Sequence, residues 1–197
     1  MRLLVGLGNP GRRYRATPHN AGFRICDRFA EQNHLGEPAH KFQGVFWRDR
    51  LRGEDVGVLK PETYMNVSGD AVAEAVRYLP VEPSDLIVVF DDMDLPLGRL
   101  RIRPRGGSGG HRGLQSIIDS LGTKDFARLR LGVGRPPSGW KPTGYLLGKL
   151  GKESRQRLDE AVERAVEAVE TLLWRGIEEA MNHYNPSPPD TGEEKKE

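Results

Sequence analysis

Two runs of consecutive apolar residues predict strands that are buried on both faces. They lie at residues 3–7 (Leu-Leu-Val-Gly-Leu) and 86–90 (Leu-Ile-Val-Val-Phe), and neither run alternates with polar residues. Between the two runs, the pattern predicts helices at about 20–33 and 69–79 and shorter strands at about 45–51 and 56–59. The first half of the chain therefore alternates between strands and helices.

The second half continues the alternation. We expect a strand at about 100–103, a helix at 113–121, a strand at 129–133, a long helix at 154–174 and a short helix at 177–183. The long helix has one apolar stripe, formed by Leu158, Val162, Ala165, Val166, Val169, Leu172 and Leu173. Together the pattern predicts a single-domain α/β fold, with a twisted, mixed, mostly parallel sheet and helices on both faces.

Length and composition agree with one domain. The chain has 197 residues and is 37% apolar, which is enough for one core, and we assign the catalytic domain to residues 1–185. The proline-rich, charged end at 186–197 predicts a disordered tail. No apolar run approaches the roughly 20 residues of a membrane span, and the apolar start is too short for a signal peptide, so we expect a cytoplasmic protein without membrane attachment. The lone cysteine, Cys26, excludes an internal disulfide framework, and its apolar neighbours predict a core position.

Basic charge is concentrated in one segment. The net charge is +2, but the tail holds four acids against two lysines, which leaves +4 on residues 1–185. Within residues 99–112 the chain has no acid and five arginines, at positions 99, 101, 103, 105 and 112. Guanidinium groups suit phosphate oxygens, but arginines also keep an exposed edge strand soluble, and charge alone leaves both interpretations open.

Three polar side chains follow predicted strands. Asn9 follows the first strand, Asn66 follows the strand ending near residue 60 by a short loop, and Asp91 caps the strand ending at Phe90. In open α/β sheets, ligands bind at the carboxyl ends of the strands. We therefore expect these side chains to meet at one rim of the sheet.

Two glycine-rich motifs suggest chemistry that their surroundings do not support. Residues 6–11 match the dinucleotide fingerprint G-x-G-x-x-G, but prolines and basic residues separate them from the next helix. In addition, no second strand that ends in an acidic residue follows about 20 residues later, as that fingerprint requires. Residues 106–110 match the serine-hydrolase motif G-x-S-x-G, but a basic, proline-broken segment precedes them in place of a buried strand. The second motif better suits a backbone cradle for an anion or a flexible turn.

Metal ligands form no clear set in the sequence. Asp91, Asp92 and Asp94 are close enough to hold magnesium, but a turn follows at once and no further ligands have suitable spacing. The five histidines show no zinc spacing. We therefore expect neither a metal nor another cofactor.

Five blocks, in order, resemble the bacterial-type peptidyl-tRNA hydrolase family. They are residues 6–11 (GLGNPG), 17–22 (TPHNAG), 60–69 (KPETYMNVSG), 91–96 (DDMDLP) and 106–114 (GGSGGHRGL). Each block alone is weak, but the ordered set is specific and spans about residues 3–184. The resemblance implies a cytoplasmic, metal-independent ester hydrolase that frees tRNA from stray peptides during translation.

The resemblance also implies roles for individual residues. His19 corresponds to the general base, Asp91 to its partner, and Asn9, Asn66 and His111 to residues that line the substrate channel. An imidazole with a reference pKa of about 6.5 suits this role, since a carboxylate on its other nitrogen fixes the tautomer. Asn66 would stabilise the oxyanion or hold the water, and Asn9 would recognise the peptide's amide.

The remaining implied contacts concern tRNA, through its CCA end and acceptor stem. The expected binding residues are Asn9, Tyr14, Asn20, Tyr64, Met65, Asn66, Arg103, Arg105, His111 and Arg112. Tyr14 and Tyr64 match positions near the tRNA end, although partial burial would also explain an aromatic residue there. Arg112 stands where the family usually has asparagine, and an arginine has no acceptor.

The family resemblance implies a monomer without an obligate protein partner. Two other functions compete with this one. Retention of His19, Asp91 and Asn66 argues against a non-catalytic RNA-binding relative, and titration with NAD would reveal a nicotinamide oxidoreductase.

Overall fold

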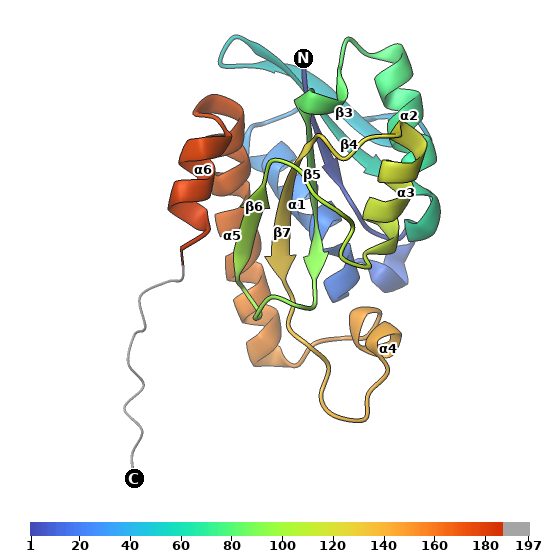
Figure 1. Cartoon of the computed structure of the whole chain (residues 1–197), viewed down its shortest axis with the longest axis vertical. Helices are drawn as coiled ribbons and strands as arrows, with labels where there is room; N and C mark the ends of the chain where they lie inside the picture. Colours follow the sequence, from blue (N-terminus) through green and yellow to red (C-terminus); the bar gives the residue numbers. More distant parts are fainter. Residues whose placement is uncertain (187–197) are drawn as a thin grey trace.

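The computed structural model describes residues 1–186 and contains one seven-stranded mixed sheet, with strand order β2-β3-β4-β1-β5-β7-β6 (Figure 1). The strands are β1 (Arg2–Gly6), β2 (Ala39–Lys41), β3 (Gly44–Leu51), β4 (Glu54–Pro61), β5 (Leu86–Asp92), β6 (Leu100–Arg103) and β7 (Ala127–Gly132). Strands β4, β1, β5 and β7 are parallel neighbours, and β3 and β6 run antiparallel to them. The mixed, mostly parallel sheet is as predicted.

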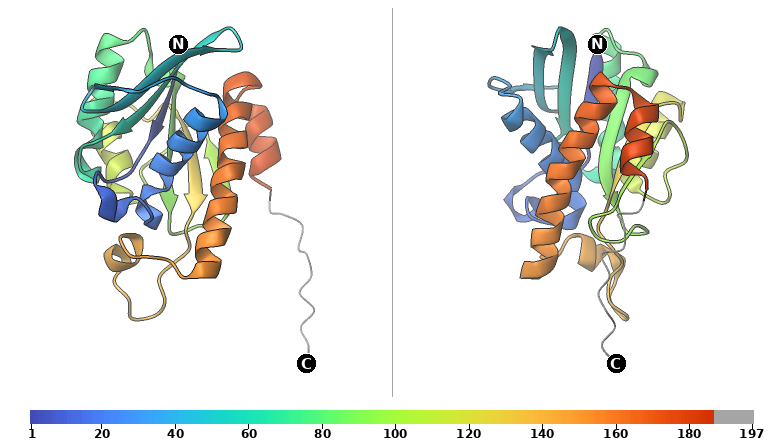
Figure 2. Two further views of the ribbon diagram at one scale, coloured as in Figure 1. Left: turned by 180° about the vertical axis from the view of Figure 1, so that it is seen from behind. Right: turned by 90° about the vertical axis from the view of Figure 1, so that its left-hand side faces the viewer.

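Helices cover both faces of the sheet (Figures 1 and 2). Helices α1 (Ala21–Gln32), α5 (Lys152–Trp174) and α6 (Ile177–Tyr184) pack on one face, and α2 (Ser68–Tyr78) and α3 (Arg112–Leu121) pack on the other. The predicted apolar stripe of α5 is buried along its whole length, from Leu158 to Leu173. Among the described helices, none has the length and apolarity needed to cross a bilayer.

Glycines let α1 sit directly on the centre of the sheet. A Cβ atom on Gly22 would lie 2.4 Å from both the Leu7 amide nitrogen and the Val89 carbonyl oxygen. Gly6 is equally crowded, since its Cβ would lie 2.3 Å from the Gly22 carbonyl oxygen. Packing therefore explains Gly6 and Gly22 of the first two sequence blocks, and this close contact brings the start of α1 to the carboxyl ends of β1 and β5.

The structure differs from the predicted elements in several places. Strand β5 runs on to Asp92, so Asp91 lies inside the strand and pairs with Leu131 of β7. The short strand β2 and the helix α4 (Pro142–Leu146) were not predicted. The predicted tail at 186–197 lies outside the described residues, apart from Pro186.

Candidate active site

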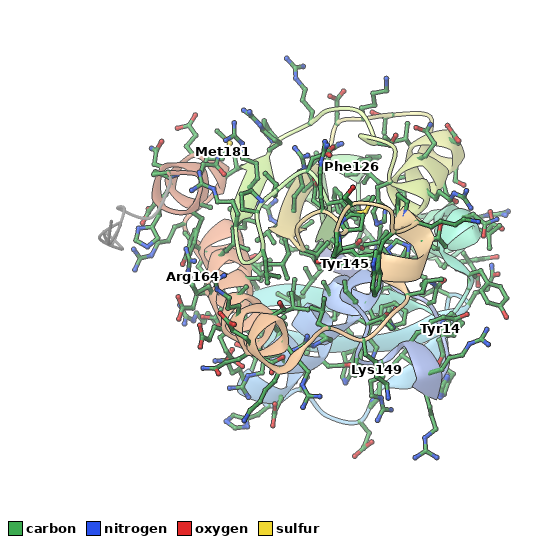
Figure 3. All side chains as sticks on the ribbon, turned by 90° about the horizontal axis from the view of Figure 1, so that it is seen from below. Tyr14, Phe126, Tyr145, Lys149, Arg164 and Met181 are labelled. Atoms are coloured by element: carbon green, nitrogen blue, oxygen red, sulfur yellow. The ribbon has the colours of Figure 1, made fainter. Side chains whose placement is uncertain are left out.

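A cavity of about 490 Å³ opens at the carboxyl end of the parallel strands. Helix α4 lies beyond the tips of these strands in Figure 1, and Figure 3 looks onto this end of the molecule. Nine of the twelve predicted catalytic and binding residues line the cavity: Asn9, Tyr14, His19, Tyr64, Met65, Asn66, Asp91, His111 and Arg112. The structure thus gathers most of the predicted residues at the expected rim.

His19 and Asp91 form a hydrogen-bonded pair in this cavity. His19 belongs to the 3-10 helix η2 (Pro18–Asn20), which leads into α1. Its Nδ1 lies 2.9 Å from Asp91 Oδ1 and 3.0 Å from Oδ2. Since a carboxylate only accepts, Nδ1 carries the proton and Nε2 keeps its lone pair. In the described part of the chain Nε2 has no hydrogen-bond partner.

A second histidine contacts the same carboxylate. His111 Nε2 lies 3.2 Å from Asp91 Oδ1, and the two histidine rings are 5.3 Å apart. His111 is also the N-cap of α3, because its Nδ1 accepts a hydrogen bond from the Leu114 amide at 3.2 Å. Nδ1 is therefore the acceptor and Nε2 the donor, so both nitrogens of His111 are occupied.

The Asp91 carboxylate is buried but ionised. Burial alone raises the pKa of Asp91, but the hydrogen bonds from His111 and His19, together with electrostatic attraction to the two rings, more than offset it and hold the pKa well below its usual range. Its side chain is 1% exposed. A fixed negative charge therefore stands behind His19 and stabilises any proton that His19 takes up.

Asn9 is held rigidly against the cavity. Its backbone amide donates to Asn20 Oδ1, and its carbonyl accepts from Asn20 Nδ2, both at 2.9 Å. Its side-chain Oδ1 accepts from the Met65 amide at 3.0 Å, so the Nδ2 group remains for a ligand. Asn20 itself is buried and does not line the cavity, which makes it a support for Asn9.

The other predicted lining residues present groups that remain available. Asn66 follows Met65 in the 3-10 helix η3 (Met65–Val67), and its side-chain amide makes no hydrogen bond to any described residue. Tyr64 is 62% exposed at the rim, and Tyr14 lies at another side of the cavity, with Arg13 stacked on its ring. These two rings are accessible from outside.

Arg103 and Arg105 lie in a neighbouring cavity of about 420 Å³, which shares Ser108 and Gly109 with the first. Arg128 and Arg130 also line it. Arg112, the first residue of α3, instead lines the main cavity. Arg128 is buried, which no sequence pattern indicated. Its guanidinium donates to the carbonyls of Gly106, Gly107, Lys124 and Phe126 and so ties the glycine-rich loop to β7.

The structure explains why neither glycine-rich motif has the function that its pattern suggests. Two 3-10 helices, η1 (Arg12–Tyr14) and η2, separate β1 from α1, so residues 6–11 do not open a helix as a dinucleotide fingerprint does. The glycine-rich segment follows β6, an antiparallel edge strand, and both nitrogens of His111 are already engaged. Among the described residues no hydrogen bond joins the Ser108 hydroxyl to His111 or to His19, so Ser108 is not paired with a histidine base as the nucleophile of a serine hydrolase is.

The three clustered acids do not form one metal site, because their side chains have different partners. Asp91 faces the histidines, Asp92 pairs with Arg130, and Asp94 pairs with Arg135 at 2.8 Å. His19, Asp91 and His111 do bring three donor atoms within 4.8 Å. A metal there would need the lone pair of His111 Nε2, which would place a protonated Nδ1 against the Leu114 amide and break the helix cap.

Helix α4 closes one side of the cavity and was missed in the sequence. Pro142, Thr143, Leu146 and Leu147 line the cavity. The Tyr145 hydroxyl donates to the Val133 carbonyl at 2.6 Å and so anchors α4 just beyond β7, with the side chain directed inward in Figure 3. The aromatic residue after Pro-Thr-Gly was the one available signal.

Comparison with known proteins gives one consistent result. The profile of the family described as "Peptidyl-tRNA hydrolase" matches residues 3–194. The peptidyl-tRNA hydrolase of Symbiobacterium thermophilum is 47% identical over 186 residues, covering 93% of this chain and 98% of the relative, and that of Bacillus subtilis is 41% identical over 185 residues, covering 94% and 98%. The crystal structure of the Acinetobacter baumannii enzyme superimposes with a TM-score of 0.88 at 35% identity, covering 96% of each chain.

Proposed function

The chain belongs to the peptidyl-tRNA hydrolase family and is an ester hydrolase that frees tRNA from peptide, and we propose that His19 and Asp91 carry out the reaction. One observation supports these roles most strongly. Asp91 holds the His19 Nδ1–H, which leaves Nε2 as an unoccupied base in the cavity. This is the arrangement that activates a water molecule.

The proposed reaction needs no covalent intermediate. His19 Nε2 takes a proton from water while the water oxygen attacks the ester carbonyl carbon. The tetrahedral intermediate then expels the ribose oxygen, which receives that proton from the imidazolium. Asp91 stabilises the imidazolium between the two transfers, because its charge lies 2.9 Å from Nδ1.

Two asparagines position the substrate in this proposal. The Asn66 amide donates to the oxyanion or holds the attacking water, since it lines the cavity beside Met65. Asn9 Nδ2 donates to a carbonyl of the peptide, and its fixed orientation through Asn20 and Met65 supports this role. Recognition of a peptide amide would exclude free aminoacyl-tRNA.

The tRNA itself would bind across the rim. Tyr14 and Tyr64 offer exposed rings for the CCA end, while Arg103, Arg105 and Arg112 face phosphates of the CCA end and acceptor stem. The neighbouring cavity shares Ser108 and Gly109 with the main cavity, so the bound tRNA would extend from the main cavity to Arg103 and Arg105. We further propose that the protein acts as a cytoplasmic monomer without an obligate protein partner or a metal.

The test compares N-acylated aminoacyl-tRNA with free aminoacyl-tRNA, following release of intact tRNA. We expect rapid release from the acylated substrate and little from the free one. Binding of both substrates without release would contradict the hydrolase and support a non-catalytic RNA-binding protein. Equal release from both would contradict the role of Asn9.

A further inference from the structure

The cavity holds two histidines on one carboxylate, and their hydrogen bonds make them chemically different. His19 uses only Nδ1, toward Asp91, whereas His111 uses both nitrogens, one toward Asp91 and one toward Leu114. The His111 ring is further fixed by packing against Phe90, with ring centroids 4.8 Å apart. Its side chain is 9% exposed. His111 is therefore a rigid donor and has no free lone pair with which to act as a base.

We propose that His111 is a positioning residue, whose Nε2–H, fixed by its role as the N-cap of α3, holds the Asp91 carboxylate in its orientation toward His19. The inference rests on the proposed roles of His19 and Asp91. Oδ1 of Asp91 accepts from both rings, at 2.9 Å from His19 and 3.2 Å from His111. The two donors share one oxygen, and this fixes the rotation of the carboxylate about its side-chain bond.

Apart from His19, only His111 among the described groups around Asp91 donates a hydrogen bond to its carboxylate. The neighbouring acids Asp92 and Asp94 form ion pairs with Arg130 and Arg135, and as ionised carboxylates they cannot donate to Asp91. Arg112 lines the same cavity, but its side chain makes no hydrogen bond to any residue that the structure describes. Within residues 1–186, the hydrogen bonds to the Asp91 side chain therefore come from His19 and His111.

Two substitutions at His111 separate its two functions. In His111→Asn the side-chain oxygen takes the place of Nδ1 and still caps α3, but the side chain is too short to reach Asp91. In His111→Gln the amide nitrogen takes the place of Nε2 and still donates to Asp91, but the cap is lost. Gly122→Ala is the matched control, because Gly122 ends the same helix at a φ of 66° and lies outside the main cavity.

The variants are compared by kcat and KM on N-acylated aminoacyl-tRNA, by the pH–rate profile and by Tm. For His111→Asn we expect an unchanged Tm, an unchanged KM and a kcat lowered by about tenfold, the loss typical of one charge-assisted hydrogen bond. The acid limb of the pH–rate profile of this variant should move to higher pH. The Asp91 carboxylate, having lost the hydrogen bond from His111, attracts a proton on His19 more strongly. His111→Gln, which keeps the donor to Asp91, should lower Tm but lose less kcat than His111→Asn. Gly122→Ala should lower Tm while retaining kcat within about threefold.

The opposite pattern would overturn the proposal. A His111→Asn variant with wild-type kcat and an unmoved acid limb would show that Asp91 does not depend on His111. A kcat that follows Tm across all three variants would show that His111 acts only as a helix cap. An inactive wild-type protein would instead refute the proposed function, so the two failures are distinguishable.

Discussion

Asp91→Asn removes the charge behind His19 while changing the shape of the site very little. One oxygen of Asp91 accepts from both histidines, so the asparagine oxygen can take the same place and preserve both hydrogen bonds. The amide nitrogen then stands where Oδ2 lay, 3.0 Å from His19 Nδ1, so a donor faces the Nδ1–H in place of an acceptor. The substitution therefore removes the charge of Asp91 and one of the two acceptors that face His19, while the packing of the site stays nearly the same.

The magnitude follows from the geometry. Charge centres about 4 Å apart, in an effective dielectric of about 20, attract by about 4 kcal/mol. The amide retains a neutral hydrogen bond that contributes about 1 kcal/mol. The imidazolium would thus lose about 3 kcal/mol, which corresponds to a fall in kcat of roughly 100-fold.

Single-turnover hydrolysis of N-acylated aminoacyl-tRNA, measured from pH 5 to 9, checks this prediction. The acid limb of the profile should move to lower pH, because loss of the carboxylate makes protonation of His19 less favourable. KM should stay within about twofold, since the substituted atom lies behind the base. A kcat within threefold of the wild type, or a limb that moves to higher pH, would refute the assigned role of Asp91.

The same substitution has a consequence for stability. The pKa of Asp91 is lowered in the folded protein relative to the unfolded chain, where it is about 3.9. Its contribution to folding is therefore complete above about pH 4 and is lost as pH falls through the lower folded value. Urea unfolding at pH 6 and at pH 3 should show the difference between wild type and Asp91→Asn shrinking at the lower pH; a difference that grows would contradict the ionised, hydrogen-bonded carboxylate.

Four further predictions follow from the site and its surroundings. Arg112→Ala should weaken tRNA binding and flatten its salt dependence by about one phosphate contact, with kcat unchanged; an unmoved slope with depressed kcat would place Arg112 in the chemistry. Tyr145→Phe should raise KM about fivefold, since it frees α4 from Val133, and an unchanged KM would argue against the anchor. Cys26 is buried, and burial raises the pKa of its thiol, so it should react with a thiol reagent only after unfolding; rapid labelling of the native protein would contradict that burial. EDTA should leave turnover unchanged, whereas loss restored by a divalent ion would overturn the metal-free mechanism.

Hydrophobic patterning predicted most of the fold, because buried strands and amphipathic helices leave a clear sequence signal. The missed elements lack such a hydrophobic pattern. Strand β2 has three exposed residues, and α4 is a single short helix that contains a glycine and is held in place by the hydrogen bond from Tyr145. Asp91 was expected at the end of a strand, but pairing with Leu131 extends β5 past it, and such pairing depends on a strand 40 residues away along the chain.

The candidate site was predictable as a gathering of strand-end residues, but its hydrogen bonds were not. Asn9, His19 and Asp91 were expected together from the fold and the family blocks, and the structure places them in one cavity. Which nitrogen of His111 donates depends on its position at the start of α3, a feature of tertiary geometry. The burial of Arg128 likewise follows from the path of the glycine-rich loop, whose carbonyls it binds.

The central claim is that His19 is the base, and it is tested most directly by measuring tRNA release and tRNA binding for His19→Ala side by side. The account predicts that release from N-acylated aminoacyl-tRNA falls by about 1,000-fold or more, in line with the loss of a general base, while the Kd for tRNA stays within about threefold. Near-normal release by His19→Ala would contradict the account, because the proposed mechanism begins with transfer of a proton from water to Nε2 of His19.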